Sequence, residues 1–155
     1  MTNFFMQEAL SEAKKGAQTG EVPVGAILVH NKKIICRAHN LTESGSGILA
    51  HAEMLVLSEG LHLLGSRRLE NCTLYVTLEP CPMCAGAILL AKPGQLYFGA
   101  YDAVAGACGG KNDLLRNTSI EVYGGIMEEE CTALLKEFFK NLRKKDYEQT
   151  RSARL

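Results

Sequence analysis

The sequence predicts an α/β domain of three layers, in which helices cover both faces of a central sheet of about five strands. Apolar residues recur at helical spacing near both ends of the chain, and short runs rich in β-branched residues lie between turn residues. The two kinds of segment alternate, which is typical of a sheet packed between helices. A length of 155 residues suits a single domain with a buried core, which we expect to span 1–155.

The spacing of apolar residues and the positions of turn residues predict the elements in the first half of the chain. Apolar residues four apart, from Phe5 to Ala17, indicate a helix over about 2–18, with Gly20 as its stop. Residues 22–29 and 34–36 are apolar, rich in β-branched side chains and separated by a polar turn, which predicts a hairpin of two strands. A Ser/Gly-rich loop over 42–47 follows, and a helix should begin near His51.

The second half continues the alternation. Residues 73–78 predict a strand, and Pro82 is suited to the first turn of the next helix. Further strands are expected at 96–98 and, more weakly, at 120–123. Apolar residues from Met127 to Leu142 mark a long amphipathic C-terminal helix over about 127–145, with 146–155 as a flexible tail.

Composition excludes several classes of protein. The chain has no net charge, and no apolar stretch approaches the length of a membrane span. The first residues lack the basic and apolar regions of a signal peptide, and the cysteine spacing suits a reducing compartment. We therefore expect a cytoplasmic protein with no membrane association.

Four residues supply the parts of a catalytic zinc site. His51, Cys81 and Cys84 offer an imidazole and two thiolates, which hold Zn²⁺ and leave its fourth position for water. Glu53, two residues after the histidine, can move protons without binding the metal. A redox Cys-x-x-Cys pair would explain neither His51 nor Glu53, and a structural zinc site would need a fourth ligand that is not found at zinc-finger spacing.

The spacing H-x-E followed by P-C-x-x-C is the signature of zinc-dependent deaminases of nucleobases. Activated water and a carboxylate suit hydrolytic attack on an amidine-like ring carbon, with release of ammonia. A metallopeptidase is disfavoured because the motif H-E-x-x-H is absent. The glycine-rich residues 106–110 are expected to form a loop beside the site.

Several segments closely resemble the bacterial tRNA adenosine deaminases of the cytidine deaminase-like superfamily. The likeness runs from about residue 4 to 144 and includes Glu-Val-Pro-Val-Gly-Ala at 21–26, Ala-His-Ala-Glu at 50–53, Thr-Leu-Glu-Pro-Cys at 77–81 and Phe-Gly-Ala at 98–100. The resemblance implies a three-layer α/β/α cytidine deaminase-like fold with a mixed sheet, a homodimer, and one catalytic Zn²⁺ per subunit. It also implies the anticodon stem-loop of a tRNA as partner, and conversion of its wobble adenosine to inosine.

Carried over by position, the resemblance makes His51, Cys81 and Cys84 the zinc ligands and Glu53 the proton shuttle. It also implies substrate contacts for a second set of residues: Asn40, Ala52, Asp102, Phe139, Arg143 and Lys144. Lys140 is a further candidate for contact with RNA. From the residues alone, Asn40 and Asp102 suit turns, Phe139 could belong to the core, and the basic C-terminal helix could simply be solvated.

The chain departs from the family pattern where positive charge is usual. Tyr101 and Val104 flank Asp102, and Ala91-Lys92 followed by Pro93 ends the second zinc helix. Phosphate contacts supply much of the affinity for RNA, so a deaminase of free guanine, cytosine or cytidine is the alternative. A third hypothesis is a catalytically inactive partner subunit that binds zinc structurally, although such a subunit would not need Glu53.

Overall fold

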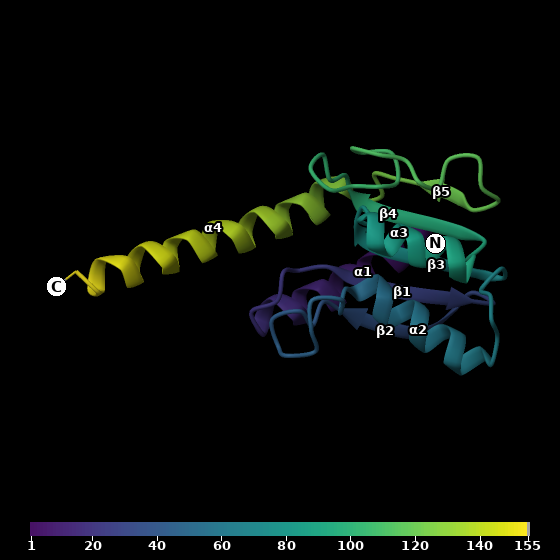
Figure 1. The fold of residues 1–155 in the computed structure, drawn as a ribbon, viewed down its shortest axis with the longest axis horizontal. Coiled ribbons are helices and arrows are strands. Elements are labelled where there is room, and N and C mark those ends of the chain that lie inside the picture. Colours follow the sequence, from purple (N-terminus) through teal and green to yellow (C-terminus); the bar gives the residue numbers. More distant parts are fainter. Residues whose placement is uncertain (155) are drawn as a thin grey trace.

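The computed structural model describes residues 1–154, which form a five-stranded sheet with helices on both faces (Figure 1). The order of elements predicted from the sequence is confirmed. The elements are α1 Thr2–Gln18, β1 Gly25–His30, β2 Lys33–His39, α2 Ala52–Leu64, β3 Cys72–Leu78, α3 Pro82–Ala91, β4 Gln95–Ala100, β5 Glu121–Tyr123 and α4 Glu128–Ser152.

The sheet is mixed, as expected, with the strand order β2-β1-β3-β4-β5. Strand β1 pairs antiparallel with both β2 and β3, whereas β3, β4 and β5 run parallel to one another. Because β3 and β4 are parallel, the segments that follow Leu78 and Ala100 emerge at the same edge of the sheet. This edge brings the Cys81 segment close to the residues after Ala100.

Two apolar cores fill the spaces between the layers. Along β1, Ala26 and Leu28 face the core under α2 and α3, while Ile27 and Val29 face the core under α1 and α4. This alternation follows the pleat, because successive side chains of a strand point to opposite faces. Gly25 lets α1 pack closely on β1, since a Cβ there would clash with the Ala9 carbonyl.

Two predicted strand boundaries are wrong. Residues 22–24 precede β1, because Pro23 has no N–H to donate to a strand ladder. Strand β2 extends to His39, because it stays paired with β1 as far as Gly25 although its side chains do not alternate cleanly. The fold therefore uses a longer second strand than the apolar residues alone indicated.

The C-terminal helix ends later than predicted. Helix α4 continues through Ser152, so residues 146–152 are helical rather than the start of a tail; Leu155 lies outside the described residues. The sequence from Asn141 to Ser152 is rich in good helix formers and contains neither Gly nor Pro, which explains the extension. Figure 1 shows α4 running out from the rest of the fold, and its residues 141–152 are all exposed.

Within residues 1–154, no helix combines the length and apolar character needed to cross a membrane.

Candidate metal centre and active site

The starts of two helices on the same face of the sheet position the three predicted metal ligands. His51 is the N-cap residue of α2, and Cys81 is the N-cap residue of α3, with Cys84 one turn further on. Both N-cap residues have extended backbone conformations, and Pro82 starts α3 with the φ angle that a helix requires. The two helix starts therefore meet, which brings the three predicted ligands together.

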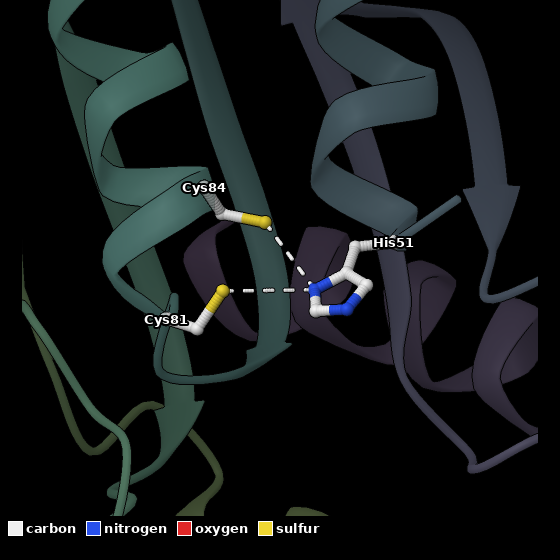
Figure 2. A group of neighbouring side chains, drawn as sticks. All are labelled: His51, Cys81 and Cys84. Atoms are coloured by element: carbon white, nitrogen blue, oxygen red, sulfur yellow. Dashed lines mark hydrogen bonds between the residues drawn. The ribbon is translucent and has the colours of Figure 1, made fainter. Parts of the chain in front are cut away.

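The ligand atoms converge on one point. Figure 2 shows the ring of His51 with Nδ1 turned toward both sulfur atoms. His51 Nδ1 lies 3.7 Å from Cys81 Sγ and 3.5 Å from Cys84 Sγ, and the three atoms all lie within 4.8 Å of one another. Tetrahedral zinc, about 2.3 Å from sulfur and about 2.0 Å from nitrogen, separates such donors by roughly 3.5 Å. The donor set and its spacing therefore fit zinc.

The pKa values of the two cysteine thiols are shifted in opposite directions. A hydrogen bond from the Cys84 thiol, helped by the charge of His51, lowers the pKa of Cys81 well below that of an ordinary thiol. The same hydrogen bond, together with burial, raises the pKa of Cys84. One thiolate is thus already favoured without a metal, and a divalent cation would displace the remaining proton.

Glu53 is a buried carboxylate in the first turn of α2, only 3% exposed. Its Oε2 atom is buried and has no hydrogen-bond partner, the sole such side-chain atom among the described residues. Burial raises the pKa of Glu53, so that its carboxylate holds a proton more readily than an exposed one. An unpartnered carboxylate oxygen beside three metal ligands suits a group that takes up and returns a proton.

Asn40 links the end of β2 to the start of α2. Its side-chain Oδ1 accepts a hydrogen bond from the Ala52 N–H at 2.9 Å, and its own N–H donates to the Val24 carbonyl at 3.1 Å. Both Asn40 and Ala52 are buried and lie next to His51. Contacts of Asn40 and Ala52 with a substrate remain predictions.

Asp102 begins a loop after β4 and forms the turn that its residue type suggested. Its Oδ1 accepts hydrogen bonds from the N–H groups of Val104 at 2.9 Å and Ala105 at 3.0 Å. This loop, which contains the glycine-rich residues 106–110, lies beside the site, since the Ala107 N–H donates to the Pro80 carbonyl at 2.9 Å. The expected site-flanking loop is therefore confirmed.

Two buried carboxylates that sequence reasoning missed hold the loops next to the site. Glu79 accepts hydrogen bonds from the N–H groups of Asp102 at 2.8 Å, Cys108 at 3.0 Å and Gly110 at 2.6 Å. Glu21 accepts from the N–H groups at 43 and 44, at 3.1 and 2.8 Å. The available signal was an acidic residue one or two positions before a proline in an apolar segment, at Glu21-Val22-Pro23 and Leu78-Glu79-Pro80.

The loop after β2 surrounds the Glu21 carboxylate with hydrogen-bond donors, which favour its ionised form. Burial alone would raise the pKa, but the hydrogen bonds from residues 42–44 outweigh burial and lower it. A carboxylate that accepts several backbone N–H groups is stabilised in its charged form.

The predicted RNA contacts on α4 are partly gathered in one groove. Phe139, Lys140 and Arg143 line a cavity of about 480 Å³ together with Tyr101. Phe139 is 39% exposed, so it is not a core residue; its neighbour Phe138 is the more buried of the two. Lys144 is exposed on the same helix but does not line this groove.

Comparison with known proteins identifies relatives of this arrangement. The family model for the cytidine and deoxycytidylate deaminase zinc-binding region matches residues 1–100. The tRNA-specific adenosine deaminase of Bacillus subtilis (strain 168) is 52% identical over 145 residues, which cover 91% of this chain and 90% of that protein.

Two solved structures are similar. One comes from a study of A-to-I editing by tRNA:A34 deaminases at the wobble position of transfer RNA; it is 38% identical, with a TM-score of 0.78, and the match covers 85% of this chain and 99% of that one. The guanine deaminase of Bacillus subtilis is 34% identical with a TM-score of 0.60, over 63% of each chain. The chain therefore belongs to the zinc-binding cytidine and deoxycytidylate deaminase family and, within it, to the tRNA-specific adenosine deaminases.

Proposed function

We propose that this protein is a zinc-dependent hydrolytic deaminase that converts the wobble adenosine of a tRNA anticodon to inosine. The observation that carries the proposal is the convergence of His51, Cys81 and Cys84 beside the buried, unpartnered carboxylate of Glu53. The similarity to the Bacillus subtilis tRNA-specific adenosine deaminase over most of both chains supports the choice of substrate.

The three ligands would bind the metal, and Glu53 would transfer protons. One Zn²⁺ per subunit, held by His51, Cys81 and Cys84, would lower the pKa of a water molecule toward neutrality. Glu53 accepts a proton from the attacking water and delivers it to the adjacent ring nitrogen of the base. The oxygen of the water would bond to the ring carbon, and Glu53 would then take the remaining proton from the new hydroxyl group and pass it to the amine. The exocyclic C–N bond breaks, ammonia leaves and a carbonyl remains.

The partner would be an anticodon stem-loop. A base inside a helix cannot reach a recessed site, so the target nucleotide has to be turned out of its stack. The groove at Phe139, Lys140 and Arg143 offers an aromatic ring and two cations, which suit an unstacked base and its phosphates. Asn40, Ala52 and Asp102 are proposed to contact the target and its neighbouring nucleotide, and Lys144 the phosphates further along α4.

A deaminase of free guanine is the second candidate. The likeness to the guanine deaminase of Bacillus subtilis and the zero net charge favour it. The match to the guanine deaminase covers 63% of this chain, whereas the match to the structure from the tRNA:A34 deaminase study covers 85%. This difference favours tRNA over free guanine as the substrate.

The test is inosine formation in an anticodon stem-loop with a wobble adenosine, using zinc-loaded protein. A stem-loop whose only loop adenosine lies outside the wobble position is the matched control, and free guanine, cytosine, adenosine and cytidine run in parallel. Inosine confined to the wobble position is expected. If the protein deaminates a free base or nucleoside and leaves the RNA unchanged, that compound and not tRNA is the substrate.

The assembly is proposed to be a cytoplasmic homodimer. Support for self-association comes from large apolar side chains that are well exposed near the site, at Leu90 on α3 (81%) and at Ile48 (81%) and Leu49 (63%) before His51. Sedimentation equilibrium should give twice the mass of one 16.9 kDa chain; a single-chain mass at micromolar concentration would contradict the dimer.

A further inference from the structure

Glu79 lies two residues before the metal ligand Cys81, and its carboxylate accepts hydrogen bonds from the loop after β4. The side chain is 2% exposed, and both of its oxygens are used. Oε2 accepts the Asp102 N–H, and Oε1 accepts the N–H groups of Cys108 and Gly110. One carboxylate therefore binds the beginning and the end of a nine-residue loop, 102–110.

The loop is built around this carboxylate. A Cβ added at Gly106 or at Gly110 would fall on Glu79 Oε2 and on the Asp102 carbonyl. Neither glycine has the positive φ angle that would otherwise demand this residue type. The absence of a side chain at these two positions is explained by the close approach of the loop to Glu79.

The same loop is joined to the metal-binding segment. The Ala107 N–H donates to the Pro80 carbonyl at 2.9 Å, directly before Cys81. The charges of Glu79, Asp113, Glu53 and Cys81 add to burial in raising the pKa of Cys108 to about 12, which agrees with a loop next to the site. Tyr101, directly before the loop, lines the groove beside α4 and so connects the loop to that groove.

We infer that Glu79 is a positioning residue of the deaminase: its carboxylate holds the 102–110 loop in the conformation that receives the substrate beside the metal ligands. The inference rests on the proposed function, because it assigns the loop to substrate binding. The carboxylate takes no part in proton transfer, since its oxygens are fully engaged by backbone N–H groups of the loop.

The test compares Glu79→Gln with wild type in three measurements. Glutamine keeps the size of the side chain but loses its charge and presents an NH₂ group to backbone donors. Amide hydrogen exchange at Asp102, Cys108 and Gly110 should become about tenfold faster or more, because charge-assisted hydrogen bonds are among the stronger ones. Zinc content should stay at one per chain, and KM should rise about tenfold while kcat changes less than about threefold.

The split between KM and kcat separates positioning from general stability. A variant that is merely less stable loses active protein, which lowers the apparent kcat and leaves KM unchanged. Glu21→Gln is the matched control, since Glu21 is also buried and also holds a loop by backbone N–H groups. It should speed exchange at Glu43 and Ser44 without affecting Asp102, Cys108 and Gly110.

A second variant tests the same contact if Glu79→Gln does not fold. Gly110→Ala leaves Glu79 in place and pushes the loop away from it, and Gly86→Ala, which meets open space on α3, is its control. The inference is overturned if amide hydrogen exchange in the 102–110 loop of these variants equals that of wild type. It is also overturned if exchange becomes faster while KM stays at the wild-type value. The exchange measurement needs no substrate. KM is measured with whichever substrate the wild-type protein deaminates. A failure of the tRNA proposal is therefore distinguishable from a failure of the inference about Glu79.

Discussion

The region around the two helix starts and the outer half of α4 differ in how their residues are held. Cys84, Ile88 and the backbone around Glu53 are buried between the sheet and two helices, and their polar groups meet defined partners. Residues 141–152 of α4 are all exposed, and most of them are residue types with high helix propensity. The contrast indicates that the metal ligands are held before substrate arrives, whereas the proposed RNA contacts Arg143 and Lys144 lie on a solvated helix.

The largest effect is expected from Glu53→Gln, which removes the proton carrier and keeps its shape. We expect kcat to fall by about 10²–10⁴-fold, the usual contribution of general acid–base catalysis. Zinc content, measured by mass spectrometry of the metal, should stay at one per chain, because Glu53 is not a ligand.

Glu12→Gln is the control for this variant. Glu12 is also buried, at 6% exposure, but it pairs with Lys15 on α1, on the opposite face of the sheet. Its kcat should equal that of wild type. Activity of Glu53→Gln within tenfold of wild type would contradict the proposed mechanism.

A pair of core and surface substitutions measures the contrast in packing directly. Ile88→Ala, at a fully buried position of α3, should lower the free energy of unfolding by about 2–5 kcal/mol, because it leaves a cavity in the core between α3 and the sheet. Leu142→Ala, at a position 43% exposed on α4, should cost less than about 1 kcal/mol. Urea denaturation of both variants is the measurement, and equal losses would contradict the difference between the two regions.

Removing two cations from α4 should weaken binding of RNA without touching the chemistry. For Lys140→Ala/Arg143→Ala we expect KM for the stem-loop to rise about tenfold, with kcat unchanged. The dependence of binding on salt should also become shallower, by about one unit of the logarithmic slope for each phosphate that the variant no longer binds.

The matched control removes two cations elsewhere. Lys33 and Arg67 are both exposed. Lys33 pairs with His30, and Arg67 precedes Cys72, the first residue of β3. Cys81 follows the opposite end of β3, so both cations are remote from the metal ligands. Lys33→Ala/Arg67→Ala should leave both KM and the salt slope as in wild type. An equal loss of binding in the two double variants would assign the effect to overall charge rather than to α4.

The smallest effect is a gain in stability from Gly86→Ala. Gly86 lies inside α3, and a Cβ there meets no atom within 4 Å. Alanine should raise the free energy of unfolding by about 0.5–1 kcal/mol, because glycine loses more backbone entropy in a helix. Thermal unfolding would show it, and a lowered midpoint would reveal a neighbour that packs on this face.

The order of the elements could be predicted because each has a local pattern, such as the four-residue spacing in α1 or the apolar run of β3. The end of α4 at Ser152 was missed because apolar spacing stops before the helix does, although residues of high helix propensity continue to Ser152. The partners of Glu21 and Glu79 could not be predicted, because each accepts N–H groups from residues more than 20 positions away. A hydrogen bond of that kind leaves no periodic trace in the sequence.

The sequence by itself determined the chemistry, because His51, Glu53, Cys81 and Cys84 are residue types whose side chains bind metal and carry protons wherever they meet. It also determined the kind of fold, since amphipathic spacing selects the faces that are buried. Only the tertiary structure decided that α2 and α3 start side by side, that Glu53 Oε2 is left without a partner, and that Glu79 holds the 102–110 loop. These depend on distances between segments, which the packing of helices on the sheet sets.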